Sequence, residues 1–270
     1  MTEPARRLHR ARQHRLGIPG VEARSICSGH VFPRHAHDQF GIGVITGGAQ
    51  RSWSLLGHVD AGAGDVIMLN PGEMHDGAPI GGVRRWHMIY LDPPVVAREI
   101  ENELPEERVT FLPVAHDPPF ARAIARFFLR LARGPLDAMA IEEQLLSWLG
   151  RIAGRHLVHG PRPSHRPPSV AAAVRRLEEA PEAPASLAEL AALSGVSRFQ
   201  LLRGFSREVG ATPHAYLVQL RVRLARRCLA QGLSPAEAAA LAGFADQSHM
   251  TRAFVRHLGI PPARYRAALR

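Results

Sequence analysis

LAGFADQSHMTRAFVRHLG, residues 241–259, predicts a tight turn followed by an amphipathic helix. Its apolar residues Met250, Phe254 and Leu258 recur every four positions, so they share one buried face of a helix. Asp246 stands just before the helical pattern and is suited to cap it. The other faces carry Gln, Ser, His and Arg, side chains that suit base edges and phosphates. The stretch therefore predicts a DNA-recognition helix, although a solvated polar face would give the same pattern in an isolated helix.

A second version of this unit lies upstream in the chain. Ala191 and Gly195 lie 48 residues before Ala239 and Gly243. A repeat at this period indicates one supersecondary module used twice. Small residues and turn glycines at these positions predict two helix-turn-helix units, because two crossing helices need a close approach and a tight turn. Four further pairs lie 49 residues apart: Phe205 and Phe254, Gly210 and Gly259, Pro213 and Pro262, Tyr216 and Tyr265.

The tandem unit resembles the DNA-binding domain of AraC-type transcription regulators over residues 169–270. The resemblance implies sequence-specific binding of double-stranded DNA, with RNA polymerase as a further partner. Met250 stands where the family more often has an aromatic residue, and Val255 stands where a basic residue is usual. The missing basic residue implies one phosphate contact fewer. The residues that carry the resemblance are Gly243, Phe244, Asp246, Gln247, Ser248, His249, Arg252 and Phe254, followed by Gly259, Pro261, Pro262, Tyr265 and Arg266.

Each predicted recognition helix offers its own set of DNA contacts. Ser197 with Gln200 forms a capping box at the start of the first one. A long helix from Thr212 to Gln231 would hold the two units apart, so that they enter successive major grooves about 34 Å apart. The candidate DNA contacts are Ser197, Arg198, Gln200, Arg203 and Arg207 in the first unit, and Gln247, Ser248, His249, Thr251, Arg252 and Arg256 in the second.

The charge distribution agrees with a polyanionic partner. The net charge is +10, and every basic side chain apart from histidine is arginine. Residues 169–270 hold 14 Arg against 7 Asp plus Glu, which gives +7 of the +10. A basic C-terminal module fits a nucleic-acid partner. An arginine-rich composition of the whole proteome would produce the same bias.

The two cysteines favour a reduced setting. Cys27 and Cys228 lie in different halves of the chain and form neither a disulfide framework nor a thiolate metal site. The N-terminus is basic but lacks the apolar region of a secretory signal, and no run is long enough to span a membrane. We therefore expect a cytoplasmic protein with no membrane partner.

The N-terminal half has the pattern of a small β-barrel. Apolar runs cut by Gly and Pro fill residues 21–93 and predict strands joined by tight turns. We expect an α+β two-domain chain: a cupin-like β-barrel followed by helices, then an all-α domain with two helix-turn-helix units. The expected segments are a loose or partly helical basic arm (1–20), the barrel (21–118, of which 99–118 would be loop with one short helix), helices (119–157), a Pro-rich linker (158–168) and the DNA-binding domain (169–270).

Two histidine-bearing segments resemble the cupin motifs. Gly29 is followed by His35-Ala36-His37, and Gly64 is followed by NPGEMH, which ends at His75. The resemblance implies the ligand-binding barrel found in AraC-type regulators. The glutamate of the first motif would fall near Gly41, which has no side chain to ligate a metal.

These residues predict an effector pocket. A small barrel can hold one small molecule, and nothing in the sequence fixes which one. We expect no cofactor, although His35, His37 and His75 could converge on zinc or iron. Trp53 and Tyr90 are expected in the core, and His58 and His116 at the surface. The candidate effector-binding residues are His35, His37, Gln39, Glu73, His75, Trp86 and His87.

Two apolar-striped helices follow the barrel. The stripes in residues 120–134 and 136–157 would either cover the barrel or pair with another chain. Pairing is what the resemblance implies, so we expect a homodimer.

The sequence thus predicts an effector-responsive transcription regulator that is not an enzyme. No nucleophile has a matched base, and the Gly-rich GVITGG (43–48) fits a strand and turn better than a phosphate loop. Two alternatives remain: a cupin metalloenzyme or metal sensor fused to a DNA-binding module, and a ligand-independent architectural DNA binder.

Overall fold

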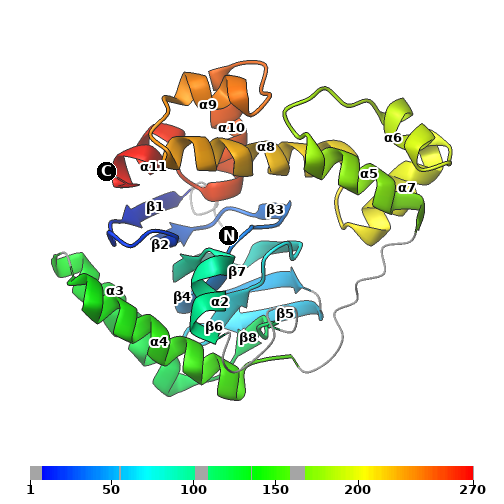
Figure 1. Cartoon of the computed structure of the whole chain (residues 1–270). Coiled ribbons are helices and arrows are strands. Elements are labelled where there is room, and N and C mark those ends of the chain that lie inside the picture. Colours follow the sequence, from blue (N-terminus) through cyan, green and yellow to red (C-terminus); the bar gives the residue numbers. More distant parts are fainter. Residues whose placement is uncertain (1–7, 55, 101–108, 135, 159–167, 270) are drawn as a thin grey trace. The chain divides into compact units, whose positions relative to one another are not determined.

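The computed structural model describes residues 8–54, 56–100, 109–134, 136–158 and 168–269. The chain divides into two compact units with the boundary between Arg162 and Pro163. The first unit is rich in strands and the second is helical, so the predicted fold class is confirmed (Figure 1). Most of the predicted linker (158–168) and the start of the predicted arm (1–20) lie outside the described residues.

The first unit contains an eight-stranded antiparallel sheet. Its main path runs β1-β2-β7-β4-β6-β8, with β3 paired to β7 and β5 paired to β4. The long strands β4 and β7 shift register near Gly47, and such irregularities let a strand bend. The strands are β1 (His9–His14), β2 (Val21–Ser28), β3 (Phe32–His35), β4 (Phe40–Ser54), β5 (Gly57–Gly62), β6 (Val66–Leu69), β7 (His75–Leu91) and β8 (Val114–Ala115).

Strand β1 corrects the prediction of a loose or partly helical arm over 1–20. Residues His9–His14 pair with β2 along their whole length. Arg10 and Arg12 are exposed, whereas Ala11 and Gln13 are partly buried. This alternation of exposed and partly buried residues is typical of a sheet-edge strand, and its high arginine content concealed it.

The sheet has two differently packed faces because successive side chains of a strand point to opposite sides. One face packs with Ile42, Val44 and Ile89 against the helices of this unit. The opposite face carries a smaller cluster that includes Trp86, Met88 and Tyr90. Any ligand site on this second face is therefore separated from the helices by the sheet itself.

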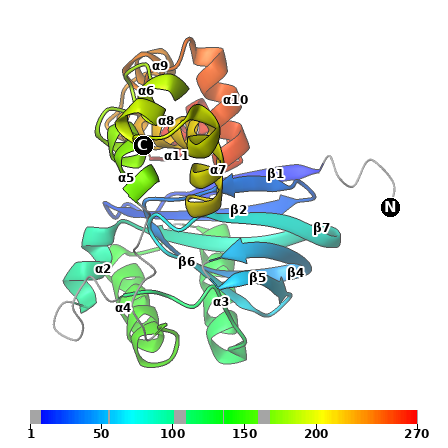
Figure 2. The same cartoon turned by 90° about the vertical axis from the view of Figure 1, so that its right-hand side faces the viewer.

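Among its described residues, the first unit has three helices: α2 (Pro93–Ile100), α3 (Pro118–Arg133) and α4 (Ala138–Arg155). α3 and α4 lie together on one side of the sheet (Figure 2). Their apolar stripes are buried there, with Phe127 and Trp148 packed edge to face. The prediction of loop with one short helix over 99–118 is partly wrong, since Val114–Ala115 form a strand. α2 reaches into this range and ends at Ile100, and residues 101–108 lie outside the described part.

Asp117 joins the start of α3 to the end of α4. Its carboxylate accepts from the Phe120 backbone N–H and therefore caps α3. The same carboxylate accepts two hydrogen bonds of 2.7 Å from Arg151 and one of 2.9 Å from His156. These hydrogen bonds, with Arg151 the largest contributor, hold the pKa of Asp117 far below its usual range.

The second unit consists of seven helices among its described residues. A buried cluster that includes Val174, Leu190, Phe205 and Tyr216 holds the first helix-turn-helix unit together. Met250, Phe254 and Leu258 are buried in the second, as the four-residue spacing predicted. The helices are α5 (Pro168–Glu179), α6 (Leu187–Leu193), α7 (Arg198–Glu208), α8 (Pro213–Ala230), α9 (Pro235–Leu241), α10 (Gln247–Leu258) and α11 (Pro262–Leu269).

The helix starts predicted at Ser197, Thr212 and Asp246 are confirmed. Ser186, Ser197 and Ser234 each form a capping box, and Thr212 caps α8. Asp246 caps α10. None of the described helices is long and apolar enough to cross a membrane.

Candidate functional sites

The first helix-turn-helix unit comprises α6, a short turn and α7. Gly195 occupies the turn with a φ of +64°, a conformation that favours glycine. Ser197 Oγ accepts from the Gln200 backbone N–H at 3.2 Å, and Gln200 Oε1 accepts from the Ser197 backbone N–H at 2.9 Å. Both predicted DNA contacts at the helix start are thus also engaged in holding that start.

The second helix-turn-helix unit repeats this arrangement with α9, a turn and α10. Gly243 has a φ of +75° in that turn. Asp246 accepts from the His249 backbone N–H at 2.6 Å, so Gln247 and Ser248 begin the helix without a capping box. Gly259 ends the helix in the left-handed conformation.

Most predicted DNA-contact side chains lie on the surface of these helices. Besides Ser197 and Gln200, His249 and Arg207 make local contacts. The His249 ring packs edge to face on Phe244, with centroids 5.2 Å apart, and Arg207 forms an ion pair with its neighbour Glu208. His249 and Thr251 are partly buried. The exposed members are Ser197, Arg198, Gln200, Arg203, Arg207, Gln247, Ser248, Arg252 and Arg256.

The three histidines of the first unit converge, as their motif spacing suggested. His35 ends β3 and His75 begins β7, and the two residues are direct register partners. His37 follows two residues after His35, and its backbone carbonyl accepts from Gly72 in the turn before β7. One ligand atom from each ring lies within 4.8 Å of the others. All three side chains are at most 9% exposed, so they form a compact buried cluster of imidazoles.

Backbone carbonyls orient two of these rings. His35 Nδ1 lies 2.7 Å from the Pro33 carbonyl, and His75 Nδ1 lies 3.0 Å from the Glu73 carbonyl. A carbonyl oxygen can only accept, so Nδ1 carries the proton in each ring and Nε2 carries the lone pair. This is the tautomer that metal-ligating histidines adopt when a backbone group fixes them.

The place of the cupin glutamate is filled by apolar side chains. A Cβ built on Gly41 would lie 2.8 Å from the Met88 side chain and 3.1 Å from Leu69. A longer residue could not enter without displacing them. The cluster therefore offers three nitrogen ligands and no carboxylate from this position.

Other predicted effector contacts lie elsewhere or are already engaged. Gln39 donates to Asp92 at 2.9 Å, and the Glu73 carboxylate accepts from Asn70 at 2.6 Å. Trp86 is buried on the same sheet face as Met88 and Tyr90. It contacts the cluster through Phe32, whose ring centroid lies 6.0 Å from that of Trp86 and 6.4 Å from that of His35.

The prediction that His87 lines the same pocket as Trp86 is wrong. As its neighbour in β7, it points to the opposite face, where its ring stacks on Phe128 of α3 at 4.5 Å. Ser25 bridges it to His14 with two contacts of 2.7 Å. Burial lowers the pKa of His87, and burial followed by the nearby Arg12 lowers that of His14 to about 4. Both rings are therefore neutral at pH 7 and stabilise the contact with α3.

Of the two aromatic residues expected in the core, Tyr90 is buried and Trp53 is not. Tyr90 is buried as expected, but its ring also lies 5.3 Å from that of His37, with the Arg24 guanidinium 4.8 Å from its centre. Trp86, Met88 and Tyr90 occupy every second position of β7, and this alternation is the sequence signal that places Tyr90 on the face with Trp86. Trp53 is only partly buried, with Arg34 over its ring at 4.2 Å, so its assignment to the core is wrong. His58 and His116 are exposed as predicted.

Two family descriptions match the two units. The model described as "AraC-like ligand binding domain" matches residues 18–149, and the one described as "Helix-turn-helix domain" matches residues 190–268. The chain belongs to the AraC-type transcriptional regulators. In this AraC-type chain, a ligand-binding domain precedes a DNA-binding domain.

Individual relatives agree with this assignment. The HTH-type transcriptional regulator YbfI of Bacillus subtilis (strain 168) is 27% identical over 227 residues, which cover 81% of each chain. An AraC-like transcription regulator of Streptomyces lividans is 37% identical over 183 residues, 67% of this AraC-type chain and 51% of the relative. The fold is similar to that of ToxT from Vibrio cholerae O395, with a TM-score of 0.51, 10% identity and coverage of 97% and 98%.

Proposed function

We propose that α7 and α10 both bind the DNA major groove and together recognise one asymmetric operator. The observation that carries this proposal is that the two helices repeat the same turn and buried stripe, each behind a capped first turn, while exposing different polar side chains. We choose Arg252 and Arg203 for guanine because they are exposed and occupy equivalent positions of the two recognition helices. Arg198, Gln247 and Ser248 supply further contacts near the helix starts, and Arg256 suits the backbone.

Arg252→Ala should weaken binding to a selected operator by about 1–3 kcal/mol while leaving binding to scrambled DNA nearly unchanged. The reason is that a bidentate arginine–guanine contact is lost only at the specific site. Fluorescence anisotropy on both duplexes measures the difference, with Arg203→Ala tested in parallel. Arg264→Ala, which removes an exposed arginine of α11, is the matched control. Equal losses on both duplexes would identify Arg252 as a phosphate contact instead.

We further propose that the histidine-bearing face of the sheet binds a small-molecule effector that alters operator binding. Three buried imidazoles with Tyr90 and Trp86 nearby offer hydrogen bonding beside aromatic surface. A structure of ToxT, whose fold this chain shares, holds an unsaturated fatty acid. Coupling between two sites is reciprocal, so the effector must bind with different affinity in the presence and absence of operator DNA. Equal affinities in calorimetry would exclude a regulatory role for the ligand.

A metal sensor is the second candidate function, and the three-histidine geometry favours it specifically. His35, His37 and His75 would hold a zinc or iron ion through nitrogen, with the remaining positions open to a small ligand. Bound metal would supply charge and fix the three rings in one arrangement.

Tag-free protein should then contain about one equivalent of metal by elemental analysis. His35→Ala should lose it, whereas His58→Ala, which removes an exposed histidine of β5, should retain it. Metal loss should also lower the unfolding temperature of the first unit. Metal-free wild-type protein that is stabilised by an organic ligand would instead favour the effector proposal alone.

We propose that the regulator forms a homodimer through the outer faces of α3 and α4. Leu129, Met139 and Leu146 expose 61%, 67% and 45% of their surface. α3 exposes arginines beside its leucine, and α4 exposes Glu142 and Glu143 beside its apolar residues. These faces are complementary in charge, so α3 of one copy can pack on α4 of another in a two-fold arrangement.

Leu146→Glu should shift the protein from dimer to monomer in sedimentation velocity at micromolar concentration, because it places a charge in the apolar centre of the proposed contact. Val31→Glu is the control, since Val31 is comparably exposed but lies outside both helices. A dimer that persists in Leu146→Glu at the wild-type dissociation constant would place the interface elsewhere.

The remaining roles follow from this proposal. The protein acts on DNA in the cytoplasm without catalysing a reaction, and its DNA-bound form contacts RNA polymerase. The support for these roles is membership of a family of transcriptional regulators, together with two recognition helices that expose polar and basic side chains.

A further inference from the structure

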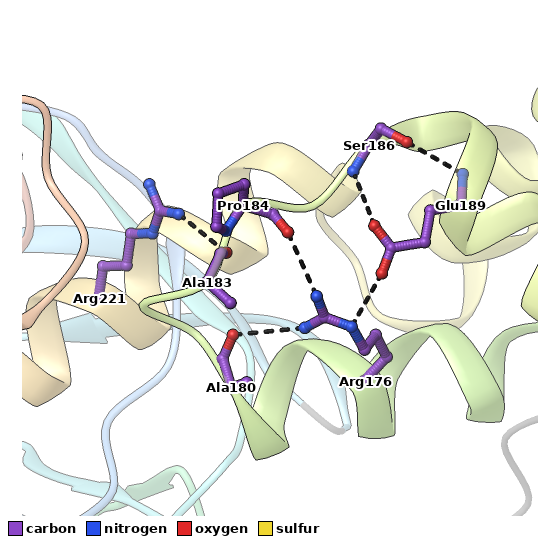
Figure 3. A network of polar contacts seen from close by, with 7 residues as sticks. All are labelled: Arg176, Ala180, Ala183, Pro184, Ser186, Glu189 and Arg221. Carbon is purple, nitrogen blue, oxygen red and sulfur yellow. Dashed lines mark hydrogen bonds and ion pairs between the residues drawn. The ribbon is translucent and has the colours of Figure 1, made fainter.

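A short segment between α5 and α6, residues 180–186, is held by side chains from several elements; we call it the 180–186 connector. Arg176 of α5 donates to the Ala180 carbonyl at 3.4 Å and to the Pro184 carbonyl at 3.2 Å. Its Nε donates to Glu189 of α6 at 2.9 Å (Figure 3). Glu189 in turn completes the capping box with Ser186. One guanidinium of α5 therefore holds Ala180 and Pro184 of the connector and, through Glu189, the start of α6.

The connector is also fixed to α8, the helix between the two helix-turn-helix units. Arg221 lies in the middle of α8 and donates to the Pro181 carbonyl at 2.8 Å and the Ala183 carbonyl at 3.2 Å. Figure 3 shows the Arg221 side chain directed at the connector from the side opposite Arg176. Two hydrogen bonds from one planar guanidinium fix the orientation of the connector relative to α8 as well as its distance from α8.

The same connector also contacts the turn of the second helix-turn-helix unit. A Cβ built on Gly243 would lie 2.3 Å from the Glu182 carbonyl oxygen and 2.7 Å from the Glu182 Cα. The two backbones therefore approach as closely as glycine allows. Because Gly243 lies between α9 and α10, this contact joins the connector directly to the turn that positions the second recognition helix.

We propose that the 180–186 connector sets the spacing and rotation between α7 and α10, and that Arg221 is a positioning residue for operator spacing. The proposal rests on the proposed function, in which both helices contact DNA. α8 joins the two helix-turn-helix units through its ends, so a small change of angle at either end displaces a recognition helix. The connector adds a second path, from α5 through Glu182 to the Gly243 turn, and Arg221 ties that path to the middle of α8.

The test measures tolerance of the operator spacing. The wild-type full chain first selects a site with two boxes from random duplex DNA, and duplexes are then made with the boxes 1 or 2 base pairs closer or farther apart. One base pair moves and rotates one box relative to the other, because B-DNA turns once in about 10–10.5 base pairs. Wild-type affinity should fall at least about tenfold for each step, which corresponds to about 1.4 kcal/mol. Arg221→Ala should lose less than about threefold, since its two units can move relative to each other.

Two further variants separate positioning from folding. Arg221→Gln keeps one amide donor and should give an intermediate spacing profile. Arg175→Ala, which removes an exposed arginine of α5, should keep the wild-type profile. Thermal unfolding confirms that each variant is folded before binding is measured.

The outcomes distinguish the two proposals. A wild-type protein with no spacing preference would contradict operator recognition by both helices. A wild-type preference that Arg221→Ala and Arg221→Gln both retain, with affinity lowered equally at every spacing, would overturn the positioning role of Arg221 and leave the proposed function intact.

Discussion

Gly243→Ala should destabilise the DNA-binding unit by about 3 kcal/mol. Gly243 has a φ of +75°, where an alanine side chain is strained. An added Cβ would also meet the Glu182 carbonyl at 2.3 Å, which is backbone and cannot rotate away. Both costs fall on the folded state, so the unfolding temperature of this unit should drop by roughly 12–24 °C, given the size of the unit.

Gly195→Ala is the matched control for this prediction. Gly195 occupies the turn of the first helix-turn-helix unit, as Gly243 does in the second, and has a φ of +64°. No atom lies within 4 Å of a Cβ added to it. It should cost only about 1 kcal/mol, the strain of alanine in the left-handed region. Differential scanning calorimetry of the full chain measures both. Equal losses in the two variants would mean that the connector moves aside and that the contact with Glu182 is not tight.

Asp117→Asn should destabilise the ligand-binding unit by about 2–3 kcal/mol at pH 7. The asparagine can still cap α3, but it offers one acceptor oxygen where the carboxylate receives hydrogen bonds on both. Arg151 and His156 then lose a charged partner in a place where Asp117 is only 6% exposed. Chemical denaturation monitored by tryptophan fluorescence measures the loss, since Trp148 packs beside this site against Phe120.

The same substitution predicts a change in acid sensitivity. The pKa of Asp117 in the folded protein lies far below the value of about 3.9 expected in the unfolded chain. The stabilisation is therefore complete above about pH 4 and is lost progressively as the pH falls below it. Asp117→Asn should flatten the stability profile in that acidic range. Asp60→Asn removes an equally short but exposed pair with Arg51, which solvent screens, and should change the profile much less. A change as large as that in Asp117→Asn would show that burial is not the cause.

The helical half could be predicted in detail because its signals are local. Ser197 with Gln200, Ser234 with Glu237 and Thr212 before Pro213 each define a helix start within four residues. The internal repeat then placed the two turns and their glycines. The connector could not be predicted, because the contacts of Arg221 and Gly243 with it join residues about 40 and 60 positions apart in the chain.

The strand-rich half could be predicted in type but less well in its side-chain directions. The motif spacing correctly brought His35, His37 and His75 together. Trp86 and His87 were grouped by proximity in sequence, although strand geometry sends neighbours to opposite faces. Strand β1 was missed because Arg10 and Arg12 obscured its alternation, and Trp53 was assigned to the core because hydrophobicity alone does not distinguish a covered ring from a half-exposed one.

The unequal caps of α7 and α10 have a consequence for the operator. In α7 the side chain of Gln200 accepts from the Ser197 backbone N–H as part of the cap. In α10 the cap is the Asp246 carboxylate, and neither Gln247 nor Ser248 takes part in it. Gln247 and Ser248 can thus turn toward a base without loosening their helix. We expect the two boxes to differ in information content: a collection of selected sites should tolerate more base changes in the box bound by α7, and new targets should arise more readily through substitutions in α10.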